Sequence, residues 1–328
     1  MRAVVDDLAR RTGFSGVVRL DAEGEVRFEA AYGLADRRWH VPVETGTRFG
    51  IASGTKGLTA LTVLALVARG TLGLGHTARS VLGADLPLVD DVVTVEHLLA
   101  HRSGIGDYVD ESVVSVDDHV LPVPVHLLAS TEDYLQVLDG RPQVSAPGER
   151  FAYSNSGFVL LALIAERAAG APFHDLVDEL VCQPAGLAGT GFPRTDELPP
   201  GAATGYLEAS GLRTNALHLP VRGSGDGGAY STVADVHRLW DAVLDGRVVP
   251  QQLVDVMTTP RSRGADGRRY GLGLWLDPDD DVLVLSGHDA GVSFRTSHGR
   301  RRRATWTVVS NTSEGARPLA RLLSAAPA

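Results

Sequence analysis

The stretch that decides the fold is residues 49–60, which read FGIASGTKGLTA and contain Ser53 and Lys56. Lys56 is the only lysine in the chain, because the other 30 of the 31 lysine and arginine side chains are arginines. An arginine stays protonated in proteins, whereas a lysine loses its proton when it is desolvated or set beside another cation. A single lysine three residues after a serine therefore points to proton-transfer chemistry that arginine cannot perform.

The apolar run at residues 58–68 predicts a buried helix, too short to cross a bilayer, that begins near Ser53. Residues three apart share a helix face, so the Ser53 hydroxyl and the Lys56 amine can meet within hydrogen-bonding distance. The Ser53 amide, in the first turn, has no partner inside the helix and can donate to an oxyanion. This spacing also occurs on ordinary solvated helices, so the pattern needs support from elsewhere in the chain.

Length and composition limit the classes of protein that the chain can be. Its 328 residues suggest about two structural units, and a hydrophobic fraction of 44% is enough for a large core. The net charge of -9 argues against a nucleic-acid-binding protein. The single cysteine, Cys182, excludes an intrachain disulfide, and the acidic start of the chain does not read as a signal peptide. We therefore expect a cytoplasmic protein without nucleic-acid or membrane partners.

The order of predicted elements indicates a sheet built from both ends of the chain. An amphipathic first helix precedes strand-like segments at 15–20 and 26–32. Near the other end, a helix at 232–244 is followed by four strand-like segments, at 271–276, 282–286, 292–297 and 305–310. A closing helix is predicted at 316–325.

The middle of the chain has a different pattern, with helices separated by loops rich in proline and glycine. The clearest helical segments are 95–101, 131–138 and 158–169. We therefore predict an α/β fold of the α+β type, an antiparallel sheet flanked by helices. Residues 1–71 and 225–328 would form the sheet domain and residues 72–224 a helical insertion domain, with the active site between them.

A second stretch, residues 147–158, places Tyr153 and Asn155 ahead of an apolar helix. Because they are two apart, both side chains can project into one cleft. A neighbouring ammonium favours the ionised form of a phenol, so Tyr153 could take a proton from Ser53 and pass it to a leaving group. By themselves, the two residues also fit a core tyrosine and a helix-capping asparagine.

A third stretch, residues 285–292, reads LSGHDAGV. Here His288 could donate to or orient a substrate, and the Gly291 amide could be a second oxyanion donor. The bland alternative is an exposed histidine in a turn at a strand end.

Taken together, the three stretches resemble the penicillin-recognising serine hydrolases, which include class C β-lactamases, D-alanyl-D-alanine carboxypeptidases, D-aminopeptidases and related carboxylesterases. The similarity runs from about Gly16 to Asn311, with the motifs in family order. The matches are Ser53 and Lys56 to SxxK, Tyr153 and Asn155 to YxN, and His288-Asp289-Ala290 to the site of KTG or HTG.

The resemblance implies a β-lactamase/transpeptidase-like fold and a role for each matched residue. Ser53 would be the acylated nucleophile, with Lys56 and Tyr153 as the proton-transfer pair. Asn155 would orient the substrate, and the amides of Ser53 and Gly291 would form the oxyanion hole. The resemblance implies neither a metal ion nor an organic cofactor.

The third motif departs from the family in two ways. His288 replaces the usual lysine, which weakens the anchoring of an anionic substrate unless an arginine such as Arg295 substitutes. Ala290 replaces the usual glycine and adds a methyl group where the strand edge would meet the acyl group. Both departures favour ester or amide hydrolysis over potent β-lactamase activity.

Three further patterns have simpler interpretations. His97 and His101 have a metal-compatible spacing but no obvious third ligand. Residues 223–228 fit GxGxxG without a surrounding strand-turn-helix unit, so we interpret them as a loop. The basic run Arg300 to Arg303 fits a solvated hairpin turn.

The sequence thus predicts a serine hydrolase that forms an acyl-enzyme on Ser53 and acts on a small-molecule or peptide-like substrate. Ester hydrolysis is the first choice. The alternatives are a D-amino-acid-specific amidase or peptidase, and a biosynthetic acyl transferase or peptide cyclase. A non-turnover ligand-binding protein of the same fold is a third possibility, against which the retained lysine argues. The oligomeric state is not predicted.

Overall fold

The computed structural model of the chain describes residues 1–109, 115–277 and 281–325. Its main element is an antiparallel eight-stranded sheet with the strand order β2-β1-β12-β11-β10-β9-β8-β7. The two ends of the chain meet inside this sheet, where β1 (Gly16–Ala22) pairs with β12 (Ala304–Ser310). The predicted α/β fold, with its antiparallel sheet and flanking helices, is confirmed.

The remaining strands extend this sheet on both sides or form small pairs. The sheet continues with β2 (Glu25–Tyr32), β11 (Val292–Gly299), β10 (Val282–Asp289), β9 (Trp275–Leu276), β8 (Arg269–Tyr270) and β7 (Ser262–Arg263). The small pairs join β3 (Leu34–Asp36) to β4 (Val41–Pro42) and β5 (Phe49–Gly50) to β6 (Tyr230–Ser231).

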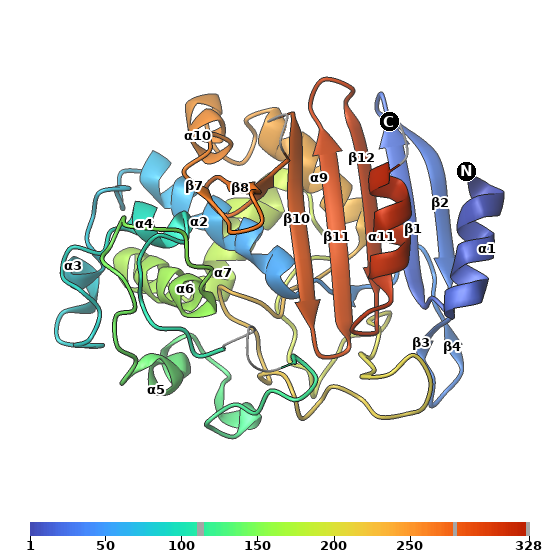
Figure 1. The fold of residues 1–328 in the computed structure, drawn as a ribbon, viewed down its shortest axis with the longest axis horizontal. Coiled ribbons are helices and arrows are strands. Elements are labelled where there is room, and N and C mark those ends of the chain that lie inside the picture. The colour runs from blue at the N-terminus through green and yellow to red at the C-terminus, as the bar shows by residue number, and fades with distance from the viewer. Residues whose placement is uncertain (110–114, 278–280, 326–328) are drawn as a thin grey trace.

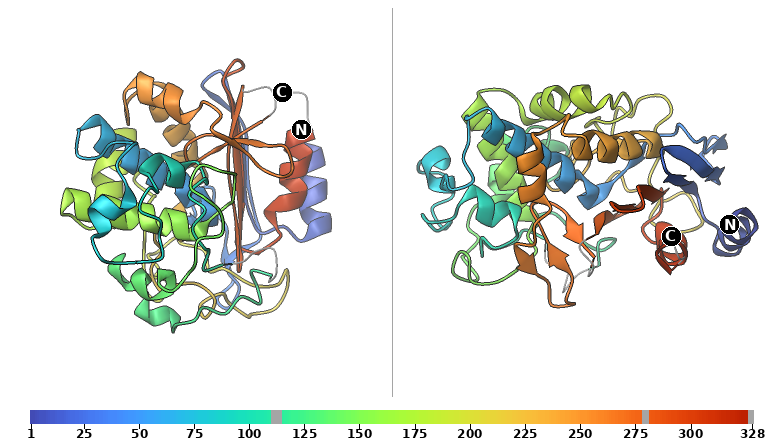
Figure 2. Two further views of the ribbon diagram at one scale, coloured as in Figure 1. Left: turned by 60° about the vertical axis from the view of Figure 1, so that its left-hand side comes forward. Right: turned by 90° about the horizontal axis from the view of Figure 1, so that it is seen from above.

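Helices cover both faces of the sheet (Figures 1 and 2). On one face lie α1 (Arg2–Thr12) and α11 (Ala316–Ala325), which bury a cluster containing Val5, Val308 and Leu319. The other face and the helical layer beyond it share a larger core. This layer contains α2 (Thr55–Ala68), α3 (Ala78–Leu82), α4 (Val95–Leu99), α5 (Leu135–Leu138), α6 (Asn155–Ala169), α7 (Phe173–Val177), α8 (Gln183–Ala185), α9 (Val233–Leu244) and α10 (Gln251–Met257).

Helix α2 is the predicted buried helix, and each of its residues from Thr55 to Leu66 is buried. A helix that is apolar on every side is stable only when other elements surround it, and α2 contacts α6 as well as the sheet. A Cβ atom at Gly57 would lie 2.8 Å from a Leu285 methyl carbon, so this glycine lets β10 approach α2 closely. The start of α2 is thereby fixed against the middle of the sheet.

One predicted strand is shorter than expected. The segment 271–276 contains only β9, because the chain turns at Gly273, which has a φ of 83°. A side chain there would collide with Ala60 of α2, 2.3 Å from the position of a Cβ atom. The chain between β8 and β9 is therefore a tight turn against α2.

In the described part of the chain, no single helix is long and apolar enough to span a membrane. One helix pair, Asn155–Ala169 with Phe173–Ala185, has the length and apolar composition of a membrane span, but the two helices meet at an angle of 88°. The division into domains at 71/72 and 224/225 stays a prediction.

Candidate active site

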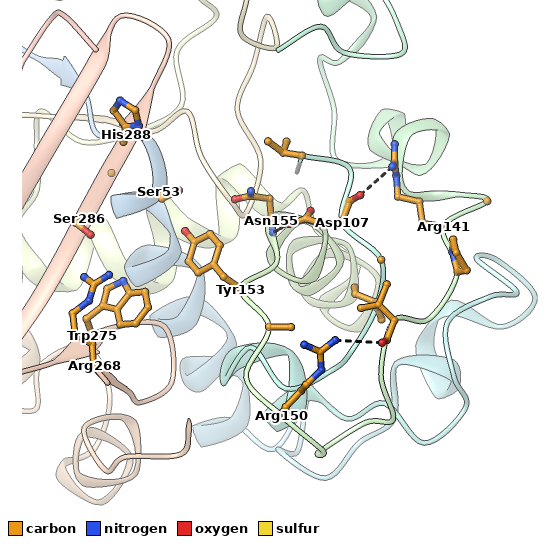
Figure 3. Close-up of a pocket in the computed structure, with 18 residues that line it drawn as sticks. Ser53, Asp107, Arg141, Arg150, Tyr153, Asn155, Arg268, Trp275, Ser286 and His288 are labelled. Atoms are coloured by element: carbon orange, nitrogen blue, oxygen red, sulfur yellow. Dashed lines mark hydrogen bonds between the residues drawn. The ribbon is translucent and has the colours of Figure 1, made fainter. Parts of the chain in front are cut away.

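Ser53 lies in a short 3-10 turn, Ala52–Gly54, directly before α2. Ala52 adopts a left-handed φ of 44°, which is unfavourable for a residue with a side chain and is typical of functional sites. The Thr55 hydroxyl donates to the Ala52 carbonyl over 2.7 Å and holds this turn. Ser53 is thereby presented, half-buried, to a cleft of about 990 Å³ between β10 and the loops of the helical layer (Figure 3).

The Lys56 amine is buried and lies beside Ser53. Its Nζ atom donates to Ser53 Oγ over 3.0 Å, to Asn155 Oδ1 over 2.8 Å and to the main-chain carbonyl of Asp226 over 2.8 Å. These three acceptors match the three N–H groups of an ammonium. The side chain of residue 56 is only 2% exposed, so its contact with the Ser53 hydroxyl is shielded from water.

Tyr153 also lies beside Ser53, with its hydroxyl directed toward the serine (Figure 3). Its ring lies 4.9 Å from Lys56 Nζ, stacks on Trp275 at 6.4 Å and packs on the buried His101 ring at 4.3 Å. Burial, and secondarily the positive charge of Lys56, lower the pKa of His101 well below its ordinary value. His101 is therefore a neutral support that accepts a hydrogen bond from the Ser154 amide over 3.1 Å.

Asn155 begins helix α6, and Asp107 holds it in place. The Asp107 carboxylate accepts hydrogen bonds from the amides of Asn155 and Ser156, over 2.8 and 2.9 Å. A carboxylate at a helix N-terminus satisfies free amides and complements the helix dipole. The Asn155 side chain is thus fixed toward Lys56 and the cleft.

Strand β10 approaches Ser53 through Gly287. A Cβ atom at Gly287 would lie 2.1 Å from the Ile51 carbonyl oxygen and 2.8 Å from the Ser53 nitrogen, so only glycine fits there. Asp277 N donates to Val282 O, and Val284 pairs with Trp275, so the even-numbered residues of β10 direct their main-chain groups toward β9.

The pairing of β10 with β9 ends at Val284. The same alternation then directs the amides of Ser286 and His288 to the unpaired edge of β10, on the side of the cleft. Both residues line the cleft together with Ser53. The His288 amide is therefore the main-chain donor that β10 offers beside the Ser53 amide.

The structure does not bring Gly291 to Ser53. Its amide donates to Ser313 Oγ over 2.9 Å, and its Cα lies against Gly205 and Asn215. Ala290 is likewise buried away from the cleft, with its carbonyl accepting from Asn215 Nδ2 over 2.9 Å. Both residues form the turn between β10 and β11. The expectation that Gly291 completes an oxyanion hole and that Ala290 meets the acyl group is therefore corrected.

The residues of β10 that lie beside the start of α2 and Ser53 are instead Leu285, Ser286 and Gly287. Leu285 packs on Gly57 of α2, and Ser286 lines the cleft. The His288 imidazole, whose side chain is 40% exposed, contacts the Glu314 carboxylate over 3.1 Å at the rim. Arg295 pairs with Ser286 across the strands and lines a second groove, of about 580 Å³, on the side of α11. Ser286, Gly287 and His288 line both this groove and the cleft.

Three arginines and one aspartate are among the side chains that line the cleft, although the chain carries a net charge of -9. Among its described lining residues, Arg141, Arg150 and Arg268 are cationic, and Asp107 directs its carboxylate to the start of α6. Arg268 is also paired with Asp266 and stacks on Trp275 at 4.2 Å. The cleft thus combines aromatic and cationic surface next to Tyr153.

The simpler interpretations of the other patterns agree with their surroundings. His97 closes a capping box with Thr94 at the start of α4, and the described residues contain no group of three metal-ligating side chains around it. In the loop 223–228, the Gly225 carbonyl accepts from Thr59 Oγ1 over 2.7 Å, so the loop packs against α2. The run from Arg300 to Arg303 lies in the exposed turn between β11 and β12.

Sequence reasoning missed Asp107, Asp226, Trp275 and Gly287. The sequence offers a weak indication for two of them: Gly287 interrupts an apolar run, and Asp226 interrupts a glycine-rich run. Asp107 and Trp275 lie in stretches without a motif, and only the folded chain places them at the cleft.

The fold and these three segments define a protein of the β-lactamase-like class. The family model described as Beta-lactamase matches residues 1–326, and the chain belongs to this family. It is 32% identical to Esterase EstB of Burkholderia gladioli over 83% of this chain and 77% of that protein. It is 31% identical to D-aminopeptidase of Brucella anthropi over 88% of this chain and 51% of that enzyme.

A solved structure has nearly the same extent. The crystal structure of a penicillin-binding protein from Bacillus halodurans aligns with a TM-score of 0.92 and 33% identity, over 98% of this chain and 99% of that one. The chain spans only 65 and 66% of the length of two penicillin-binding proteins of Bacillus subtilis that it also matches. The relatives named as an esterase and a D-aminopeptidase are hydrolases, which supports an enzyme.

Proposed function

We propose that the chain is a serine hydrolase that forms an acyl-enzyme on Ser53 and cleaves an ester or amide bond. The observation that carries the proposal is the contact of 3.0 Å between Ser53 Oγ and the amine of the only lysine, buried beside Tyr153 and Asn155. A buried lysine is costly unless it is paired, and a binding site has no evident need for it.

The proposed mechanism assigns one task to each group. The Lys56 ammonium favours the ionised form of Tyr153, which takes the Ser53 proton as Ser53 Oγ attacks the carbonyl carbon and then delivers this proton to the departing alcohol or amine. The amides of Ser53 and His288 stabilise the oxyanion, and the Asn155 side chain orients the acyl group. Water or another acceptor then releases the acyl group from Ser53.

Ester hydrolysis is our first choice, supported by the likeness to Esterase EstB. At the third motif, His288 stands in place of a lysine and is paired with Glu314, which does not favour the carboxylate of a β-lactam. Amide hydrolysis at an amino-acid residue is the second candidate, supported by the likeness to D-aminopeptidase. Two further possibilities are acyl transfer to an acceptor other than water and ligand binding without turnover. Experiment distinguishes both of them from ester and amide hydrolysis.

The test is labelling with a fluorophosphonate followed by peptide mass spectrometry, with Ser53→Ala as the control. We expect one adduct, on Ser53, which is absent in the control, and multiple turnovers of an activated ester. Labelling elsewhere, or stoichiometric binding of the ester without product release, would contradict the proposal. A cytoplasmic location, expected from the single cysteine, stays a proposal.

A further inference from the structure

A second, smaller pocket opens beside Ser53 on the side away from Tyr153. It has a volume of about 60 Å³, and Ser53, Asn155 and His288 line both this pocket and the large cleft. Tyr153 and Trp275 line only the large cleft. A substrate carbonyl at Ser53 therefore has one substituent in each space.

The position of Tyr153 decides which substituent enters which space. A leaving group must depart next to the group that protonates it, so the alcohol or amine belongs in the large cleft. The acyl substituent then extends into the small pocket. Its volume, small against the 990 Å³ of the cleft, limits this substituent to a few heavy atoms.

Apolar and polar side chains both line the small pocket, which contains a buried carboxyl group. Val116, Leu121, Leu219 and Pro220 supply apolar surface, and His119, His218 and Asp289 supply polar surface. Asp226 lies among them with 8% of its surface exposed. The Tyr108 hydroxyl donates to Asp226 Oδ2, whereas Lys56 bonds the main-chain carbonyl of Asp226. A buried carboxylate that is supported by a neutral hydroxyl is costly and gains most from a cationic partner.

Burial raises the pKa of Asp226, which favours the neutral carboxyl, and the charge of Lys56 opposes this effect. A further cation beside the carboxyl would therefore stabilise its ionised form. The same carboxyl lines a further cavity of about 50 Å³ that Tyr108 and Tyr134 border. Among the described residues that line the small pocket, none is a lysine or an arginine.

We propose that the pocket around Asp226 binds the ammonium group of a small α-aminoacyl substituent, whose side chain packs on Leu219 and Pro220. This inference rests on the proposed acyl-enzyme function and names its substrate class: esters or amides of small amino acids with a free amino group. Asp226 is then a specificity-determining residue, because a charged hydrogen bond separates an aminoacyl group from a neutral one of equal size by about 10- to 100-fold.

The test compares benzyl esters of D-alanine, L-alanine and isobutyric acid, in which a methyl group replaces the ammonium. We expect wild-type kcat/KM for one alanine ester to exceed that for the isobutyrate by at least about 10-fold. Asp226→Asn should reduce this ratio to about 2 or less, while Asp255→Asn, which removes the same charge from an exposed position on α10, should keep it. A general loss of activity cancels in the ratio.

The outcomes separate the two proposals. Turnover of all three esters with a wild-type ratio near one, or an unchanged ratio in a folded Asp226→Asn variant, overturns the role of Asp226 and leaves the hydrolase function intact. If Asp226→Asn does not fold, the wild-type ratio alone decides. Failure of the wild-type protein to turn over any ester, together with no phosphonate adduct on Ser53, overturns both proposals.

Discussion

Substitution of Gly287 by alanine tests the contact between β10 and the start of α2. The new methyl carbon would lie 2.1 Å from the Ile51 carbonyl oxygen, and such contacts are not found below 3.0 Å. The two segments must therefore separate by about 1 Å, a displacement that moves the His288 amide away from the Ser53 amide and that can cost about 100-fold in rate. Loss of one oxyanion donor costs about 10²- to 10³-fold in kcat, or about 3–4 kcal/mol.

The assay is kcat/KM for an activated ester, with the thermal unfolding midpoint measured on the same samples. Gly299→Ala is the matched control, because a methyl group there would lie 3.9 Å from its nearest neighbour, at the far end of the same hairpin. We expect Gly287→Ala to lose at least about 100-fold in kcat/KM and the control to stay within about threefold. Near-native activity of a folded Gly287→Ala variant would refute the proposed oxyanion site.

Three further predictions concern the proton-transfer groups and stability. Lys56→Arg should lose well over about 10²-fold in the rate of acylation while unfolding cooperatively, and a near-native rate would refute the role of Lys56. Tyr153→Phe should lower kcat by about 10²- to 10⁴-fold, and a change confined to KM would limit Tyr153 to binding. Burial lowers the pKa values of His174 and His298 from 6.5 to about 4, so unfolded chains take up these protons first. The contribution of the two neutral histidines to the free energy of unfolding, measured in urea, should therefore be complete above pH 6.5 and decrease toward about pH 4. The decrease should be smaller in His298→Gln.

The sequence by itself determined the antiparallel sheet and the buried helix of the nucleophile segment. The apolar run after Lys56 predicts a helix because only burial on every side stabilises such a segment, and the i, i+3 spacing brings Lys56 to Ser53 without help from distant residues. Alternating patterns at both ends of the chain indicated the antiparallel sheet. These features depend on local periodicity, which a sequence displays directly.

Only the tertiary structure decided which part of β10 meets Ser53. Moving one residue along a strand reverses the direction of its main-chain groups, so the choice between His288 and Gly291 depends on the pairing with β9 and on the turn at Ala290. Asp226 is a comparable case, because its carboxyl is buried by Tyr108, 118 positions away in the chain. Contacts over such separations depend on how whole layers pack, and no local pattern encodes them.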